Sequence, residues 1–194
     1  MKILFVRHGE STDDLSDSFG GWADFKLTDK GKLQAAKAAA KIAQLGIEFQ
    51  YVYTSNLQRA SLTARIIAKK LGIQVEEMVY LKERNTYGLL TGLNKAEAKA
   101  KYPELYNSYE AGQVLGDETI EQLNLRVDTV LNILRRKPFE NIIAVTHGKY
   151  LNAIVTLKLS KKLVKAHDGG FMLLEFKTNG DVTLVSANGI DLED

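Results

Sequence analysis

Two of the three histidines in the chain stand directly after short apolar runs, at 3–6 and at 141–146. Arg7 and His8 follow the first run, and His147 follows the second. Phosphoryl transfer needs a nucleophile and positive charge around the phosphoryl oxygens. A neutral imidazole attacks phosphorus well, and a guanidinium pairs its N–H groups with phosphate oxygens. His8 as nucleophile, with Arg7 and His147 around the phosphoryl group, could carry this chemistry.

The apolar runs before the two histidines are typical of buried strands. The carboxyl ends of parallel strands meet at one edge of an open α/β sheet, where ligands bind. We therefore expect His8 and His147 at the same edge, with Gly9 letting the backbone approach a ligand closely.

A helix is expected over 28–45, because Thr28 can cap its start and Gly46 can end it. Its predicted buried face consists of Leu33, Ala36, Ala40 and Ala43. A second helix is expected from a cap at Ser55 or Asn56 to Leu71. This second helix would place Arg59 and Thr63 one turn apart, towards the strand edge.

The remaining pattern alternates strands with helices. Strands are expected at 51–54 and 74–80, helices at 94–103, 119–134 and 149–159, and a closing hairpin at 171–177 and 182–185. Alternation of this kind predicts an α/β fold with a mostly parallel central sheet and helices on both faces. We expect one domain over 1–194, with a lid or an excursion around 84–118.

The composition is that of an ordinary globular protein. The 194 residues are 45% hydrophobic and 26% charged, and a net charge of +2 is too small to indicate nucleic acid. The absence of cysteine excludes disulfides, cysteine-ligated metals and a cysteine nucleophile. The first apolar run is too short for a signal peptide or a membrane span, so we expect a cytoplasmic protein.

Several motifs resemble, in order, those of the histidine phosphatase superfamily, which includes cofactor-dependent phosphoglycerate mutases and many small phosphomonoesterases. They are Arg-His-Gly-Glu-Ser (7–11), Gly-Gly-Trp (20–22), Leu-Thr-Asp-Lys-Gly (27–31), Tyr-Thr-Ser-Asn-Leu-Gln-Arg-Ala (53–60), Leu-Lys-Glu-Arg (81–84), Tyr-Gly (87–88), Gly-Leu-Asn-Lys (92–95) and Thr-His-Gly (146–148). The resemblance covers most of the chain and implies a three-layer, phosphoglycerate mutase-like sandwich.

The resemblance also implies the roles of the site residues. It makes His8 the residue that is transiently phosphorylated and Glu83 the general acid and base, a role that requires a carboxyl group able to protonate the leaving oxygen. The implied phosphate ligands are Arg7, Arg59, His147 and Gly148, and the implied substrate contacts are Ser11, Gly21, Tyr87 and Lys95. Between Glu83 and Gly88 the chain holds one residue more than the mutase-like pattern. No metal and no cofactor is expected, apart from 2,3-bisphosphoglycerate as primer if the protein is a mutase.

The motifs divide between mutases and phosphatases. Residues 20–22 and 87–95 resemble mutases and favour a small phosphorylated acid as ligand. Against a mutase, the arginine pair that holds the substrate carboxylate has no counterpart at 102–125, and Lys149-Tyr150 stands where mutases have Asn-Ser. The short tail after Val185 leaves little to exclude water. Residues 116–119 with Arg126 instead resemble the phosphatase branch.

We therefore expect hydrolysis of small phosphate monoesters, with mutase activity as the alternative and a non-catalytic phosphate-binding module as the third hypothesis. The partner would be a small phosphorylated metabolite, with no nucleic acid and no membrane, and we allow for a homodimer. The sequence holds no Walker-type loop, no G-x-S-x-G elbow and no H-E-x-x-H motif. Trp22, Tyr102, Tyr106 and Tyr109 are expected to pack rather than to bind ligand.

Overall fold

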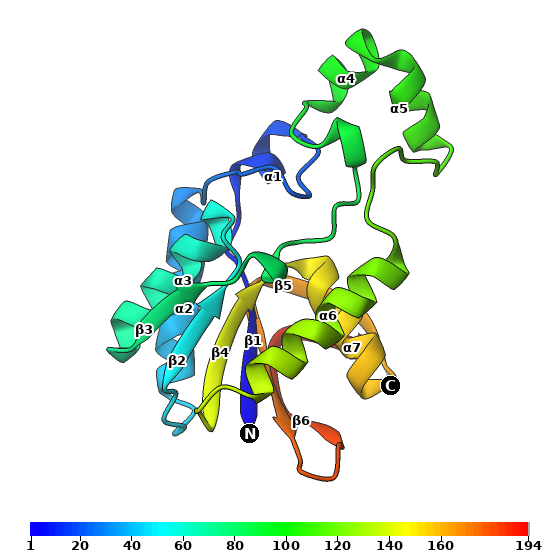
Figure 1. The fold of residues 1–194 in the computed structure, drawn as a ribbon. Coiled ribbons are helices and arrows are strands. Elements are labelled where there is room, and N and C mark those ends of the chain that lie inside the picture. The colour runs from blue at the N-terminus through cyan, green and yellow to red at the C-terminus, as the bar shows by residue number, and fades with distance from the viewer. Residues whose placement is uncertain (194) are drawn as a thin grey trace.

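One six-stranded sheet runs through the computed structural model, which describes residues 1–193 (Figure 1). It is built from β1 (Lys2–Arg7), β2 (Tyr51–Thr54), β3 (Gln74–Glu77), β4 (Asn141–Thr146), β5 (Lys162–Phe176) and β6 (Val182–Glu193). The spatial order is β3-β2-β4-β1-β5-β6. The first four strands are parallel, whereas β5 is antiparallel to both β1 and β6. This confirms the predicted mostly parallel sheet.

The pairing of β1 with β4 places the two histidines. The two strands run in register from Lys2 opposite Asn141 to Arg7 opposite Thr146. The backbone N–H of His8 then donates to the carbonyl oxygen of Thr146 at 3.1 Å. His8 and His147 therefore leave neighbouring strands at the same level, as expected from the sequence.

Helices cover both faces of the sheet, as predicted (Figure 1). On one face α2 (Asp29–Ala43) and α3 (Gln58–Leu71) bury the apolar core that includes Leu4, Val6 and Ile143. On the other face α6 (Ile120–Arg135) and α7 (Gly148–Leu159) bury a second core. Alternate side chains of the central strands supply the two cores, because successive strand residues point to opposite faces.

The buried face of α2 differs from the prediction. Thr28 caps this helix through Gly31 N as expected, but the four predicted face residues are all exposed. The buried residues are Gly31, Ala35, Ala38, Ala39 and Ile42. Alanine fills so many positions that two faces have similar apolar patterns, and Ile42 with Gly31 decides which one packs against the sheet. Leu33 stays 64% exposed.

Three other boundaries need correction. Leu57 is the N-cap residue of α3, whereas Ser55 supports the turn by accepting a hydrogen bond from Leu57 N. Strand β3 stops at Glu77, and a 3₁₀ helix, η1 (Val79–Leu81), follows it. The closing hairpin is longer than predicted, because β5 and β6 continue past a bulged region between Ala166 and Phe171.

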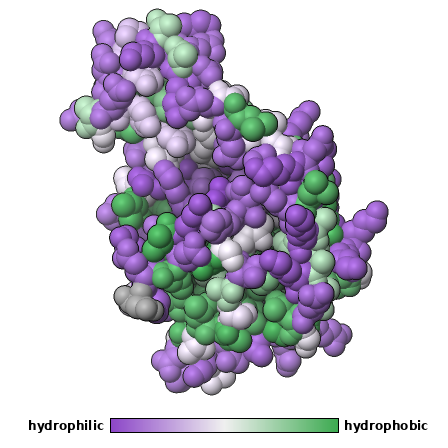
Figure 2. All heavy atoms as spheres, turned by 180° about the vertical axis from the view of Figure 1, so that it is seen from behind, coloured by the Kyte–Doolittle hydropathy of each residue, from purple (hydrophilic) through white to green (hydrophobic). Residues whose placement is uncertain are grey.

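Residues 84–118 leave the sheet and carry η2 (Gly88–Leu90), α4 (Lys95–Lys101) and α5 (Pro103–Glu110) (Figure 1). Phe19, Leu90 and Ala98 form a small core here, and Tyr106 and Tyr109 pack against it. Tyr102 does not join them and is 46% exposed. Mostly hydrophilic side chains cover this end of the molecule when it is seen from behind (Figure 2).

The segment before α2 includes α1 (Thr12–Ser16), which begins with a capping box between Ser11 and Asp14. No helix within residues 1–193 combines the length and the apolar composition that a membrane crossing needs. The last residue of the predicted domain, Asp194, lies outside the described residues.

Candidate active site

The side chains of His8 and His147 lie against each other at the carboxyl ends of β1 and β4. Their ring centroids are 4.9 Å apart, and the ring planes meet at 63° in an edge-to-face arrangement. His8 is 6% exposed, and His147 is not exposed at all. The pairing in register of the two strands thus brings together residues that are distant in the sequence.

His8 is held as a neutral imidazole whose second nitrogen keeps its lone pair. Its Nδ1 lies 2.7 Å from the carbonyl oxygen of Gly9, which can only accept, so Nδ1 carries the proton and donates. Burial, followed by the charges of Arg59 and Arg7, lowers the pKa of His8 well below 6.5. The remaining nitrogen, Nε2, is unprotonated and therefore has the lone pair that a nucleophile needs.

Arg59, near the start of α3, is 2% exposed and is fixed by its own hydrogen bonds. Its Nη1 donates to the carbonyl oxygen of Ala23 at 2.7 Å and its Nη2 to that of Gly21 at 2.8 Å. Its Nε points at His8 Nε2 from 3.3 Å. Thr63 ties the helix to the strand end, since its hydroxyl donates to Arg59 O and accepts from Gly9 N. The guanidinium is thus oriented before any ligand arrives.

Arg7 approaches from the other side of His8. Its Nη2 forms an ion pair with Asp168 at 3.1 Å, and its Nη1 donates to the carbonyl oxygen of Ala166. Both residues belong to the bulged region of β5, and the neighbouring Gly169 donates its N–H to His8 O at 3.2 Å. The bulge therefore orients Arg7 and His8 together.

His147 has two buried ring nitrogens without any hydrogen-bond partner in the protein, and Arg7 Nε is likewise buried without a partner. Burial, followed by the charge of Arg59, lowers the pKa of His147 well below 6.5. Unsatisfied buried polar atoms are costly, and each such group calls for an explanation. An oxyanion bound beside His8 would offer acceptors to Arg7 Nε and to the one nitrogen of the neutral His147 ring that carries a proton.

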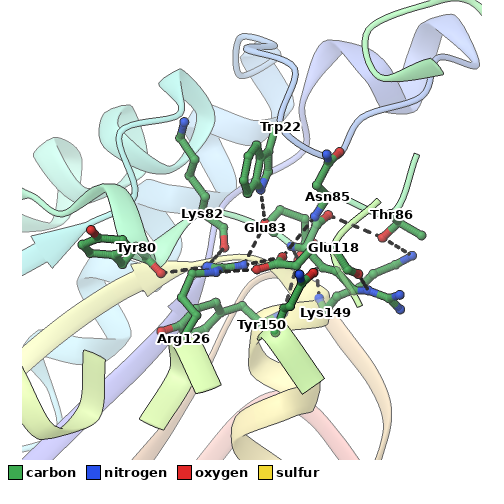
Figure 3. A network of polar contacts seen from close by, with 12 residues as sticks. Trp22, Tyr80, Lys82, Glu83, Asn85, Thr86, Glu118, Arg126, Lys149 and Tyr150 are labelled. Carbon is green, nitrogen blue, oxygen red and sulfur yellow. Dashed lines mark hydrogen bonds and ion pairs between the residues drawn. The ribbon is translucent and has the colours of Figure 1, made fainter. Parts of the chain in front are cut away.

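Glu83 lies at the amino end of α7 (Figure 3). Its Oε1 accepts from the N–H groups of Arg84 at 2.8 Å and Tyr150 at 3.2 Å, and its Oε2 accepts from Lys149 N at 3.2 Å. The first N–H groups of a helix have no partner within the helix and readily bind a carboxylate. The carboxylate is therefore held in one place.

A pocket of about 260 Å³ opens over these residues. Arg7, His8, Arg59 and Glu83 line it, and so do the four predicted substrate contacts Ser11, Gly21, Tyr87 and Lys95. His147 and Gly148 do not line it: His147 is fully buried against the His8 ring, and a Cβ on Gly148 would be 3.8 Å from Arg7 Nε. Within residues 1–193, no group of three or more His, Cys, Asp or Glu side chains is arranged to hold a metal ion.

Sequence reasoning missed several residues of the pocket. Asp13 and Asp14 line its α1 side, and Arg84 and Lys149 line it as well. The acidic pair at 13–14, one residue after the 7–11 motif, is the signal that could have revealed the first two. Asp168 gave a weaker signal, since only the following Gly-Gly at 169–170 indicates an irregularity in a strand.

Solved structures resemble the fold along nearly all of the chain. The alpha-ribazole phosphatase of Shigella flexneri superposes with a TM-score of 0.78 at 20% identity, over 97% of this chain and 96% of that one. The phosphoserine phosphatase of Entamoeba histolytica, in complex with 3-phosphoglyceric acid, gives 0.72 at 24% identity, over 96% of each chain. At these identities the likeness shows the fold.

Sequence comparison identifies the family. A 2,3-bisphosphoglycerate-dependent phosphoglycerate mutase of Azorhizobium caulinodans is 32% identical over 192 residues, which cover 93% of this chain and 89% of that protein. The family model described as histidine phosphatase superfamily (branch 1) matches residues 3–187. The resemblance noted in the motifs is therefore confirmed, and the chain belongs to branch 1 of the histidine phosphatase superfamily.

Proposed function

We propose that the protein hydrolyses small phosphate monoesters through a phosphohistidine intermediate on His8. The observation that carries the proposal is the neutral His8, with its Nε2 unprotonated, in a pocket that also presents Arg7 and Arg59. The unpartnered nitrogens of His147 support it, because an equatorial phosphoryl oxygen would give an acceptor to the one that carries the proton.

In the first step His8 Nε2 attacks phosphorus, and the bond from phosphorus to the ester oxygen breaks. Glu83 in its protonated form gives its proton to that oxygen, so the alcohol leaves as a neutral molecule. Arg7 and Arg59, which line the pocket, hold the remaining oxygens as negative charge moves between them. The proposed part of His147 is to donate its one N–H to one of these oxygens, which requires the substrate to reach past the pocket lining. The product of this step is phospho-His8 beside the Glu83 carboxylate.

In the second step water attacks the phosphoryl group. Glu83 takes a proton from the water, the bond from phosphorus to His8 Nε2 breaks, and inorganic phosphate leaves. The side chains then have their starting protonation states, so one turnover consumes one water molecule. No step needs a redox change.

Mutase activity is the second candidate, and the mutase relative at 32% identity favours it. The same phosphohistidine would pass its phosphoryl group to a hydroxyl of a second ligand, and 2,3-bisphosphoglycerate would prime the enzyme. Hydrolysis is preferred because residues 182–193 pair with β5 in the sheet, away from the pocket. Water reaching phosphohistidine competes with any second hydroxyl.

The assay that separates these functions is incubation of the pure protein with 3-phosphoglycerate, with and without 2,3-bisphosphoglycerate, alongside a panel of phosphate esters. Hydrolysis predicts release of inorganic phosphate from at least one ester, and loss of that release in His8→Ala. Rapid formation of 2-phosphoglycerate with little free phosphate would favour the mutase instead. A non-catalytic phosphate-binding module would release phosphate from none of the esters.

The proposal extends to the organisation of the protein. We propose that 1–194 acts as one catalytic domain and that residues 84–118, which contribute Tyr87 and Lys95 to the pocket, serve as its lid. The proposed partner is a small phosphorylated metabolite, with no nucleic acid and no membrane. The cytoplasmic location and the homodimer stay predictions.

A further inference from the structure

Arg126, on α6, uses all five of its N–H donors (Figure 3). Nε and Nη2 donate to the two carboxylate oxygens of Glu118, each at 2.7 Å. Nη1 donates to the carbonyl oxygens of Tyr80 at 2.7 Å and Lys82 at 2.8 Å, and Nη2 also donates to that of Glu83 at 3.2 Å. One side chain thus fixes three backbone carbonyls of the segment that ends at Glu83.

Glu118 is the acidic partner of this arginine, and the pair is largely withdrawn from solvent, with side-chain exposures of 12% and 10%. The Glu118 carboxylate also accepts from Asn85 N at 3.3 Å, and its backbone oxygen accepts from Arg84 Nε at 2.7 Å. Arg84 in turn forms an ion pair with Asp117. The first and last residues of the 84–118 segment are therefore joined to each other beside Glu83.

The contacts of Glu83 show how the Arg126–Glu118 ion pair bears on the pocket. Its backbone oxygen accepts from Trp22 Nε1 at 2.6 Å as well as from Arg126, and its carboxylate binds the N–H groups of Lys149 and Tyr150. The guanidinium of Arg126 lies 5.2 Å from the centroid of the Tyr150 ring. Arg126 thus contacts both the backbone that carries the carboxylate and a residue at the helix end that receives it (Figure 3).

We propose that Arg126, with Glu118 as its counter-ion, is the positioning residue that holds Glu83 where it can protonate the leaving oxygen of the substrate. The inference rests on the proposed function, because it needs Glu83 to act as general acid. Arg126 does not line the pocket, so it acts only through the Glu83 segment. Lysine cannot replace it, because an ammonium lacks the planar five-donor geometry.

The leaving group distinguishes positioning from general structural support. An alkyl phosphate releases a strongly basic alkoxide and needs the proton, whereas a 2,4-dinitrophenyl phosphate releases a weakly basic phenolate and does not. The ratio of kcat/KM for the two esters reports protonation in the phosphorylation step. A variant that is partly unfolded lowers both values equally and leaves the ratio unchanged.

The first test measures this ratio for the wild type, Arg126→Gln, the charge-balanced double variant Arg126→Gln/Glu118→Gln, and Glu83→Gln. In all three variants we expect kcat/KM for the alkyl ester to fall more than kcat/KM for the aryl ester, by a factor of about ten or more. The matched control is Arg65→Gln, since Arg65 is an exposed helix arginine paired with Glu77. A ratio in Arg126→Gln and in the double variant equal to that of the wild type would overturn the inference.

The second test does not depend on catalysis. Trp22 is the only tryptophan in the sequence, and its indole N–H binds the carbonyl of Glu83. Release of the Glu83 segment is expected to increase quenching of Trp22 fluorescence by acrylamide in Arg126→Gln and in the double variant, but not in Arg65→Gln. If the wild type hydrolyses no ester of the panel, the proposed function fails. Unchanged Trp22 quenching in Arg126→Gln would separately overturn the positioning role.

Discussion

The His8 and His147 rings meet edge to face with centroids 4.9 Å apart, although the two residues are far apart in the sequence. The register of β1 against β4 brings them together, since Arg7 pairs with Thr146 and each histidine is the next residue. A slip of one residue would turn every side chain of one strand to the other face. The two apolar cores that enclose these strands therefore also maintain the geometry of the site.

The burial of the two histidines predicts how stability depends on pH. Burial and the charge of Arg59 lower the pKa of His8 and His147 well below 6.5, whereas an unfolded chain binds these protons near 6.5. Below that pH the unfolded state binds more protons, so stability falls as the pH falls. We expect the free energy of unfolding to be retained above pH 6.5 and to decrease below it by up to about 1.4 kcal/mol per pH unit for each histidine.

Urea unfolding between about pH 7.5 and about pH 5 measures this dependence. The control is the double variant His8→Gln/His147→Gln, which lacks both titrating groups and should show a shallower slope. A wild-type slope no steeper than that of the double variant would contradict the assignment of two buried neutral imidazoles.

Arg59→Lys should impair catalysis more than folding. Lysine keeps the charge but cannot donate in the planar arrangement that reaches Gly21, Ala23 and His8 at once. Loss of an oriented donor to the phosphoryl group predicts a decrease in kcat/KM of about 10²- to 10³-fold. Steady-state kinetics with a phosphate ester measures the effect on catalysis, and thermal unfolding measures the effect on stability. A near-normal kcat/KM would show that Arg59 does not bind the phosphoryl group.

Asp168→Asn tests whether the β5 bulge orients Arg7. The variant keeps the size of the side chain but removes the charge that pairs with Arg7 Nη2. We expect kcat/KM to fall by about tenfold, as for the loss of one charge-assisted hydrogen bond. The matched control is Asp191→Asn, because Asp191 pairs with the exposed His167 instead. Equal effects of the two substitutions would argue against a role for Asp168 in the site.

Gly9→Ala should destabilise the fold, whereas Gly148→Ala should not. A Cβ on Gly9 would lie 2.3 Å from the carbonyl oxygen of Gly31, so the loop and the start of α2 would have to separate. On Gly148 the nearest atom would be 3.8 Å away, an ordinary contact. We expect Gly9→Ala to lose about 2 kcal/mol or more of unfolding free energy. Similar unfolding curves for the two variants would contradict this packing.

The sequence predicted the parts of the fold that depend on local pattern. Apolar runs located β1 and β4, and capping residues located the starts of α2, α4 and α6 at Thr28, Asn94 and Thr119. The packed face of α2 was wrong because alanines give little contrast between faces. Only tertiary packing decides that Leu33 stays outside.

The candidate site likewise contains residues that the sequence could predict and residues that it could not. His8 and His147 could be placed together because a strand end is a local feature and parallel strands share an edge. Asp168 could not, since a bulge in β5 brings it there, and for Asp13 and Asp14 the acidic pair itself was the only signal, because a short helix places them at the pocket. The ion pair of Arg126 with Glu118 likewise depends on where residues 84–118 return to the core.

The most direct measurement stops the turnover of a phosphate ester rapidly without the use of acid. Mass spectrometry of the peptide that carries His8 follows. We predict one phosphoryl group on His8 in the wild type, and neither this adduct nor phosphate release in His8→Ala. Turnover with no phosphorylated His8, or undiminished turnover in His8→Ala, would contradict the central claim.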